Sequence, residues 1–104
     1  MTDVPEGIEI ENVFLVEVAY TPDAPARRPA LRPRHLTRIA RLMREGRVIE
    51  AGGCADFSKA VLIVRATSEE DAVALIEEDV YVTGGVWQSP KAVGYGRVVP
   101  AVEG

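Results

Sequence analysis

The sequence predicts an α+β fold in which two helices cover one face of a four-stranded antiparallel sheet. Two observations support this class. Four apolar segments have the length and the residue types of strands, and two segments with apolar residues at helical spacing separate them. The resulting order is strand, helix, strand, strand, helix, strand, which is the split βαββαβ arrangement of the ferredoxin-like fold.

The chain opens with an acidic arm, residues 1–12, in which isoleucines and glutamates alternate as in a short extended segment. Residues 13–20 follow with the composition of a strand. Both of its faces are largely apolar, so we expect both to be covered. Glu17 interrupts one of these faces. It either faces a cavity or pairs with Arg65 on a neighbouring strand, and the pattern favours the pair.

Residues 21–32 are expected to form a loop because three prolines interrupt them, and loops of this length often form lids or pocket walls. The first helix then begins at Pro33, a residue that suits a first helical turn, and ends near Gly46. Apolar residues at positions 36, 39, 40 and 43 predict its buried face. Positions 35, 39 and 42 have the same spacing, which puts His35 at the edge of that face.

The second half of the chain contains two strands, a second helix and a final strand. Ser68, followed by three acidic residues, resembles a capping box and starts the second helix. The buried stripe of this helix is Ala72, Leu75 and Ile76. Residues 48–54 and 60–66 are expected to be strands, and residues 56–59 form the turn between them. Residues 81–85 form an irregular turn or short helix, and residues 86–99 contain the last strand.

The composition limits the classes of function. A chain of 104 residues fits one domain, with a core at about residues 13–99. The net charge of −4 argues against nucleic-acid and anionic-membrane partners, because phosphate binding uses clustered Lys and Arg. Neither a secretory signal nor an apolar run of the roughly 20 residues that span a bilayer is present. The only cysteine, Cys54, predicts a cytoplasmic protein without an internal disulfide, and we expect a buried thiol.

The apolar strands also predict a homodimer. If helices cover one face of the sheet, the other face exposes the second apolar rows of the first and third strands. Monomers rarely expose so large an apolar patch, and a small domain gains stability from a second subunit. We therefore expect two copies to pack sheet against sheet around a twofold axis.

Two residues are the main candidates for chemistry. His35 is the only histidine, and in the first turn of a helix the dipole favours a neutral ring that can accept a proton. It can equally be a partly buried histidine that only packs or caps. Asp79 extends the apolar stripe of the second helix, and a carboxylate that points inward needs a partner such as His35, or a raised pKa. Alternatively the helix ends earlier and Asp79 caps the next turn.

Four further residues can contribute to a pocket. Tyr81 can donate a hydrogen bond or belong to the core, and Trp87 can stack on a flat substrate or belong to the core. The backbone amides near Gly52 and Gly85 can hold an oxyanion. The sequence has no P-loop, dinucleotide fingerprint or zinc spacing, so we expect neither a cofactor nor a metal.

Three segments, in this order, resemble the YCII-related family over about residues 13–99. Arg32-Pro33-Arg34-His35-Leu36 is similar to its helix-one signature. Ala51-Gly52-Gly53 is similar to its small-residue turn. In the family a proline often follows the first glycine, and here Gly53 takes that place. Residues 78–86 resemble its Asp-Pro-Tyr segment, with Val80 in place of the proline.

The resemblance implies a dimeric α/β barrel with a histidine and an aspartate as its proposed active site, which here are His35 and Asp79. It adds Arg32, in the first segment, to the substrate-binding candidates. A characterised branch of the family eliminates chloride from hydroxylated aromatics. The resemblance therefore implies lyase-type acid/base chemistry without a cofactor.

Three functions remain open at this point. The first is a cofactor-independent lyase, dehydratase or isomerase acting on a small cyclic or aromatic hydroxylated substrate. In this enzyme His35 would move a proton, Asp79 would orient and stabilise the imidazole, and Tyr81 with the amides near Gly52 and Gly85 would hold an oxygen anion. The second is a dimer that binds a small ligand without turnover. The third is a cofactor-free monooxygenase of similar fold.

Overall fold

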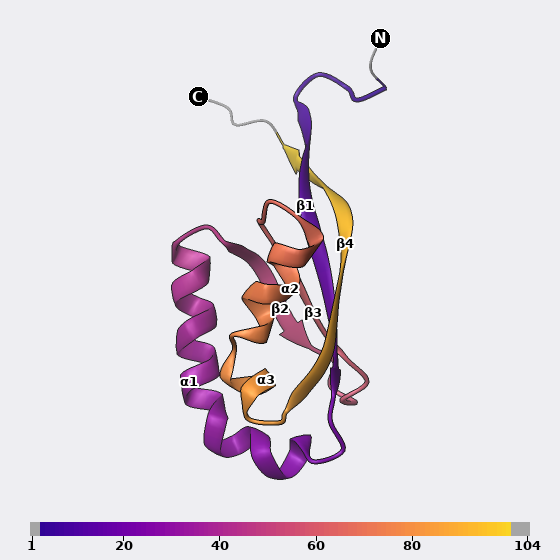
Figure 1. Cartoon of the computed structure of the whole chain (residues 1–104). Helices are drawn as coiled ribbons and strands as arrows, with labels where there is room; N and C mark the ends of the chain where they lie inside the picture. The colour runs from indigo at the N-terminus through magenta and orange to yellow at the C-terminus, as the bar shows by residue number, and fades with distance from the viewer. Residues whose placement is uncertain (1–2, 101–104) are drawn as a thin grey trace.

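The computed structural model describes residues 3–100 and confirms the predicted α+β class (Figure 1). Its four-stranded antiparallel sheet has the order β2-β3-β1-β4, and the βαββαβ order is consistent with a ferredoxin-like fold. The elements are β1 (Ile8–Tyr20), α1 (Ala24–Arg44), β2 (Val48–Gly53), β3 (Ala60–Val64), α2 (Glu69–Glu77), α3 (Val80–Thr83) and β4 (Trp87–Pro100).

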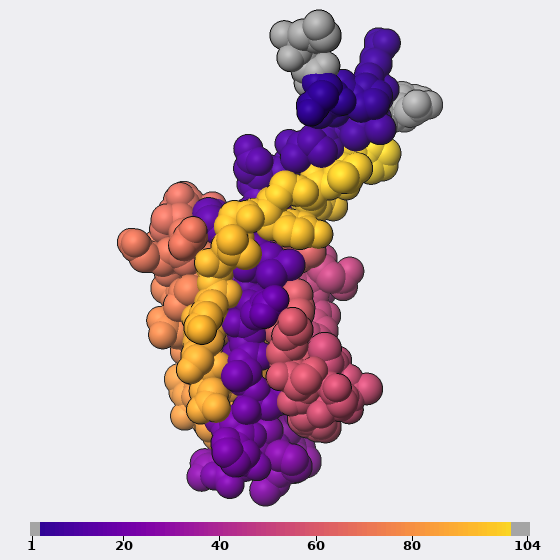
Figure 2. Space-filling view, turned by 90° about the vertical axis from the view of Figure 1, so that its right-hand side faces the viewer, coloured from indigo at the N-terminus to yellow at the C-terminus, as the bar shows by residue number. Residues whose placement is uncertain are grey.

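The strands β1 and β4 form a two-stranded ribbon that projects from the rest of the molecule (Figure 2). They pair from Ile8 opposite Pro100 to Tyr20 opposite Trp87, whereas β3 pairs with residues 14–18 of β1. The arm predicted for residues 1–12 is therefore continuous with the first strand from Ile8 onward. Residues 1 and 2 of that arm lie outside the described residues.

The core lies between the helices and one face of the sheet. Alternate residues of the two central strands point into it, and none of them is more than 1% exposed; they are Val16, Val18, Leu62 and Val64. The predicted stripe of α2 is confirmed, since Ala72, Leu75 and Ile76 are buried. The predicted N-cap is confirmed as well, because the Ser68 hydroxyl accepts a hydrogen bond from the Asp71 N–H at 3.0 Å.

The helix α1 begins at Ala24, so the predicted loop over residues 21–32 and the predicted start at Pro33 are wrong. Pro25 lies in the first turn, where its missing N–H costs nothing, but Pro29 and Pro33 lie inside the helix. The three prolines recur at every fourth position and all are exposed. The carbonyls that lose a helical donor therefore face water. Figure 1 shows that α1 bends in its first half, and interior prolines are a known cause of such bends.

The buried face of α1 also differs from the one predicted. Leu36 is 48% exposed and Met43 is 38% exposed, whereas His35, Ile39 and Leu42 are buried. Because the helix starts at Ala24, His35 lies well past its first turn. The dipole acts only within that turn, so it gives no reason for a neutral ring.

Two smaller predictions are wrong. The register places Val61 opposite Glu17 and Val64 opposite Phe14, so Arg65 lies beyond Glu17 along the ribbon. Its Nε instead donates to Glu11 Oε2 at 2.5 Å, and Glu17 faces Lys59. Cys54 is exposed, because it begins the turn after β2. Within residues 3–100, none of the helices combines the length and the apolar character needed to cross a bilayer.

Candidate active site

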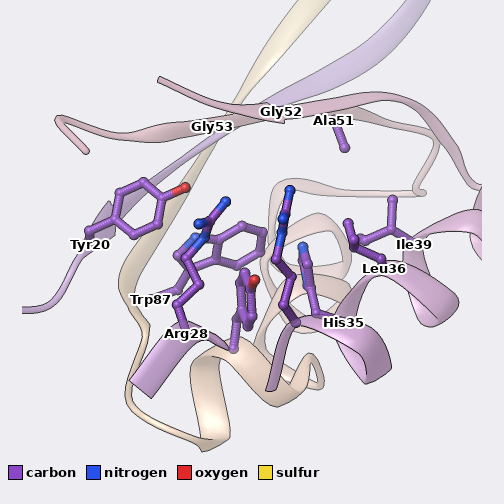
Figure 3. Close-up of a pocket in the computed structure, with 11 residues that line it drawn as sticks. Tyr20, Arg28, His35, Leu36, Ile39, Ala51, Gly52, Gly53 and Trp87 are labelled. Atoms are coloured by element: carbon purple, nitrogen blue, oxygen red, sulfur yellow. The ribbon is translucent and has the colours of Figure 1, made fainter. Parts of the chain in front are cut away.

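A cavity of about 250 Å³ lies between α1 and the sheet (Figure 3). The helix forms one wall. Positions 28, 32, 35 and 39 are separated by three or four residues, so they share one face of α1. The lining residues from this helix are Arg28, Arg32, His35, Leu36 and Ile39.

The remaining walls come from the end of the sheet. Residues 51–53 of β2 face the helix and contribute little side-chain volume (Figure 3). Tyr20 and Trp87, which are partners in the β1–β4 register, close one side, and Tyr81 of α3 also lines the cavity. Pockets for drug-sized ligands measure about 300–1,000 Å³, so this cavity suits one small molecule.

His35 and Asp79 meet at this cavity. His35 Nδ1 lies 2.8 Å from Asp79 Oδ1, and the two side chains are 8% and 0% exposed. The predicted contact between the two helical segments is thus present. The alternative interpretation of Asp79 also holds, because Oδ1 accepts the Tyr81 N–H at 2.8 Å and caps α3.

Asp79 is charged although it is buried. Burial alone would raise the pKa of its carboxyl, but hydrogen bonds from His35, the Tyr81 N–H and Arg38 together hold the pKa below its ordinary value. Arg38 Nη1 donates to Oδ2 at 3.1 Å, and Arg38 Nη2 donates to the Leu75 carbonyl at 2.7 Å. The carboxylate accepts, so His35 Nδ1 carries the proton of their shared hydrogen bond.

Two aromatic rings fix the orientation of the imidazole. The Tyr81 ring stacks on His35 with a centroid distance of 3.7 Å and an interplanar angle of 8°. The Trp87 ring meets His35 edge-on, at 4.8 Å and 82°. Since Nδ1 is bound to Asp79, Nε2 is the nitrogen of His35 that remains for a molecule in the cavity.

Three buried polar atoms at the cavity have no hydrogen-bond partner within residues 3–100: Arg28 Nε, Tyr81 Oη and Trp87 Nε1. Burial raises the pKa of Tyr81, and the neighbouring Arg28 and Arg32 guanidinium groups offset this only in part. The phenol therefore keeps its proton and can donate it in a hydrogen bond. The lining residues include two arginines and no acid, so the cavity is electropositive.

The structure brings most of the predicted site residues together. Asp79 lies behind His35, and the cavity itself is lined by Arg32, His35, Gly52, Tyr81 and Trp87. Gly85 is not among the lining residues. It occupies the turn after α3 with φ 80°, and its carbonyl accepts a hydrogen bond from Thr21 Oγ1 at 2.5 Å. The structure therefore does not place Gly85 where the predicted oxyanion-holding role requires it.

Sequence analysis missed Arg28, Arg38 and Tyr20. Arg28 fell in the predicted loop, although its spacing of four before Arg32 was a signal that the two share a helix face. Arg38 lies one turn after His35, and this spacing alone was enough to place it near the same partner. Nothing in the sequence marked Tyr20 as a pocket residue. Among residues 3–100, no group of three or more His, Cys, Asp or Glu side chains is arranged to hold a metal ion.

The fold and the site define an α+β protein of ferredoxin-like topology with a buried His–Asp pair beside a small cavity. No protein-family model matches the chain, and no curated protein matches its sequence.

Proposed function

We propose that this protein is a cofactor-independent enzyme of the lyase, dehydratase or isomerase type that acts on a small cyclic or aromatic hydroxylated substrate. The supporting observation is the buried hydrogen bond of 2.8 Å between Asp79 and His35, whose ring lines the cavity. Asp79 holds the tautomer and the orientation of the ring, and Nε2 exchanges the proton. Positioned proton transfer of this kind contributes a factor of roughly 10²–10⁴ to the rate.

The chemistry follows from the charges around the ring. In an elimination, Nε2 removes a proton from a substrate carbon. The electron pair of the broken C–H bond forms the new double bond, and the leaving group departs from the neighbouring carbon with its own bonding pair. Asp79 stabilises the imidazolium that results. The Tyr81 hydroxyl, which has no partner among the described residues, can donate to a substrate oxygen that gains negative charge.

We further propose that the chain is a divergent member of the YCII-related family. The segments that resemble it converge on one site, because residues of 32–36 and 51–53 line the cavity and residues 78–86 carry Asp79 and Tyr81. Val80, which replaces the family's proline, is the first residue of α3. Proline is favoured at that position because its N–H is not needed there, and the valine retains the turn.

We also propose a homodimer that packs through the sheet face opposite the helices. Leu15 pairs in register with both Ile63 and Val93, so the three side chains form an apolar row on that face. Val93 is 55% exposed in the single chain. Sedimentation equilibrium should give the mass of a dimer, and Val93→Asp should give a monomer because it would bury a charge at the interface.

The enzymatic proposal is tested with a panel of hydroxylated aromatic and cyclic compounds. We expect turnover by the wild type, a decrease of about 10²-fold or more in His35→Asn, and no change in Arg34→Gln, which alters an exposed arginine on the same helix. Equal rates in His35→Asn and the wild type would refute the proposal. A bound ligand that is recovered unaltered would indicate a non-catalytic binding dimer instead, and oxygen uptake with a quinol would indicate a monooxygenase.

A further inference from the structure

We infer that the cavity selects a small anionic ligand, a single-ring carboxylate, with its carboxylate on Arg28 and Arg32 and its ring against His35. The inference concerns the site described above, and it rests on the proposed function for the statement that this ligand is the substrate. Three independent features support it: the charge of the lining, the unpartnered donors, and the shape of the walls.

The lining is positive although the chain is acidic. The net charge is −4, yet Arg28 and Arg32 line the cavity without an acidic neighbour. Within residues 3–100, neither of them forms an ion pair with a carboxylate, whereas three of the other five arginines of α1 do. Those pairs are Arg27 with Asp23, Arg38 with Asp79, and Arg41 with Glu45. Two guanidinium groups without counter-charges at a concave surface attract an anion.

The unpartnered atoms specify what the anion must offer. Buried polar groups in folded proteins nearly always have a hydrogen-bond partner, and three at this cavity have none: Arg28 Nε, Trp87 Nε1 and Tyr81 Oη. Guanidinium and indole nitrogens only donate, and the protonated phenol donates as well. The missing partner therefore brings acceptors. A carboxylate has two acceptor oxygens, and its planar geometry matches the guanidinium fork.

Arg28 is held in place for this contact. Its guanidinium carbon lies 5.3 Å from the centroid of the Phe57 ring, and Phe57 meets the Tyr20 ring edge-on at 5.0 Å. Phe57 has φ 60°, a left-handed conformation that is uncommon for a bulky residue, in the turn between β2 and β3. Figure 3 shows the Arg28 side chain reaching toward the cavity beside Tyr20 and Trp87. A cation that is already oriented loses less entropy when it binds an anion.

The walls favour a planar molecule of one ring. Residues 51–53 present mainly backbone toward His35, and a Cβ at Gly53 would collide with Tyr20 Oη. The space of about 250 Å³ is below the range of drug-sized pockets, about 300–1,000 Å³. With its carboxylate on the arginines, such a ring lies next to Nε2 of His35. The substrate class thus narrows to hydroxylated ring carboxylates.

The test uses the only tryptophan of the chain as its reporter. Trp87 lines the cavity and its indole N–H has no partner among the described residues, so its NMR resonance is sensitive to occupancy. Isotope-labelled protein is titrated with benzoate and with benzamide, which has a similar size and no charge. We expect saturable shifts with benzoate at a Kd about tenfold lower than that for benzamide.

Variants assign the preference to the two arginines. Arg28→Gln and Arg32→Gln should each weaken benzoate binding about tenfold, and Arg34→Gln should leave it unchanged. Arg28→Lys keeps the charge without the planar fork and should fall between the wild type and Arg28→Gln. Well-dispersed amide spectra of each variant establish that it is folded.

Three results would overturn the inference: equal affinity for benzamide and benzoate, no saturable shift with either, or wild-type benzoate affinity in both glutamine variants. His35→Asn separates this inference from the proposed function, because it should lose turnover and still prefer benzoate. Turnover that depends on His35 without any anion preference would refute the ligand class alone. An anion preference with full turnover in His35→Asn would refute the enzymatic proposal alone.

Discussion

Asparagine in place of Asp79 keeps the size of the side chain but leaves one acceptor oxygen where the structure uses two. Oδ1 accepts from His35 and from the Tyr81 N–H, and Oδ2 accepts from Arg38. If the amide oxygen replaces Oδ1, the amide NH₂ group faces the Arg38 guanidinium. If it replaces Oδ2, the NH₂ group faces the other two donors. Each orientation sets donor against donor at a buried site.

The loss of this acceptor oxygen sets the expected decrease in the free energy of unfolding. Removing one partner of a buried ion pair costs about 3–5 kcal/mol, and because the Arg38 side chain is 15% exposed, water replaces part of the lost contact. We expect Asp79→Asn to lower the free energy of unfolding by about 3 kcal/mol. With a urea m value of about 1–3 kcal/mol/M, the midpoint falls by roughly 1–3 M. The assay is urea unfolding followed by circular dichroism at neutral pH.

The matched control is Asp23→Asn. The Asp23 side chain is 71% exposed, and it lies 3.8 Å from Arg27. We expect this variant to lose about 0.5 kcal/mol or less, because surface ion pairs contribute little. A loss in Asp79→Asn as small as that of the control would refute the reasoning.

Acid provides a second check on the same variant. The pKa of Asp79 in the folded protein is below its ordinary value of 3.8, so its charge contributes stability above that value. The contribution is lost as the pH falls through the folded pKa. The difference in unfolding free energy between wild type and Asp79→Asn should therefore be constant near neutral pH and should shrink below about pH 4. A difference that persists unchanged in acid would contradict the ionised carboxylate.

Three further predictions concern other parts of the molecule. Ala51→Leu should abolish the benzoate-induced shift of the Trp87 resonance, because the Ala51 methyl points into the cavity (Figure 3); undiminished binding would place the ligand elsewhere. Hydrogen bonds from Arg65 and Arg97 lower the pKa of Glu11 from 4.5 to about 2. The wild type should therefore lose stability relative to Glu11→Gln as the pH falls from 4.5 toward 2. Equal acid unfolding of the two proteins, followed by circular dichroism, would contradict this. Ser68→Ala should lower the unfolding free energy by about 1 kcal/mol in urea, and Ser68→Asp, which can still cap, should restore most of it.

The order of the elements was predictable because its signals are local. Short apolar segments rich in β-branched residues mark strands whatever they pack against, and the Ser68 hydroxyl caps α2 through the N–H of Asp71, only three residues away. The pairing of Asp79 was predictable for a related reason. A carboxylate in phase with an apolar stripe needs a partner, and the chain offers one histidine on the neighbouring helix.

The start of α1 was not predictable from local rules. Proline normally ends a helix, and only the complete fold shows that Pro25, Pro29 and Pro33 all face solvent, where water can bind the carbonyls without a donor. The same error hid the positive wall of the cavity, because the additional turns carry Arg28 and Arg32. The pocket residues come together from five separate elements, β1, α1, β2, α3 and β4, so no single periodicity in the sequence connects them.

The ribbon of β1 and β4 connects two distant ends of the molecule. Its outer portion pairs Ile8 with Pro100, while the cavity lies at the opposite end, where Tyr20 pairs with Trp87. Between these ends, the Glu11 carboxylate binds Arg97 of β4 and Arg65, the residue that follows β3. A surface linker or a fluorescent label joined beside Ile8 would therefore lie at the end of the ribbon that is away from the imidazole.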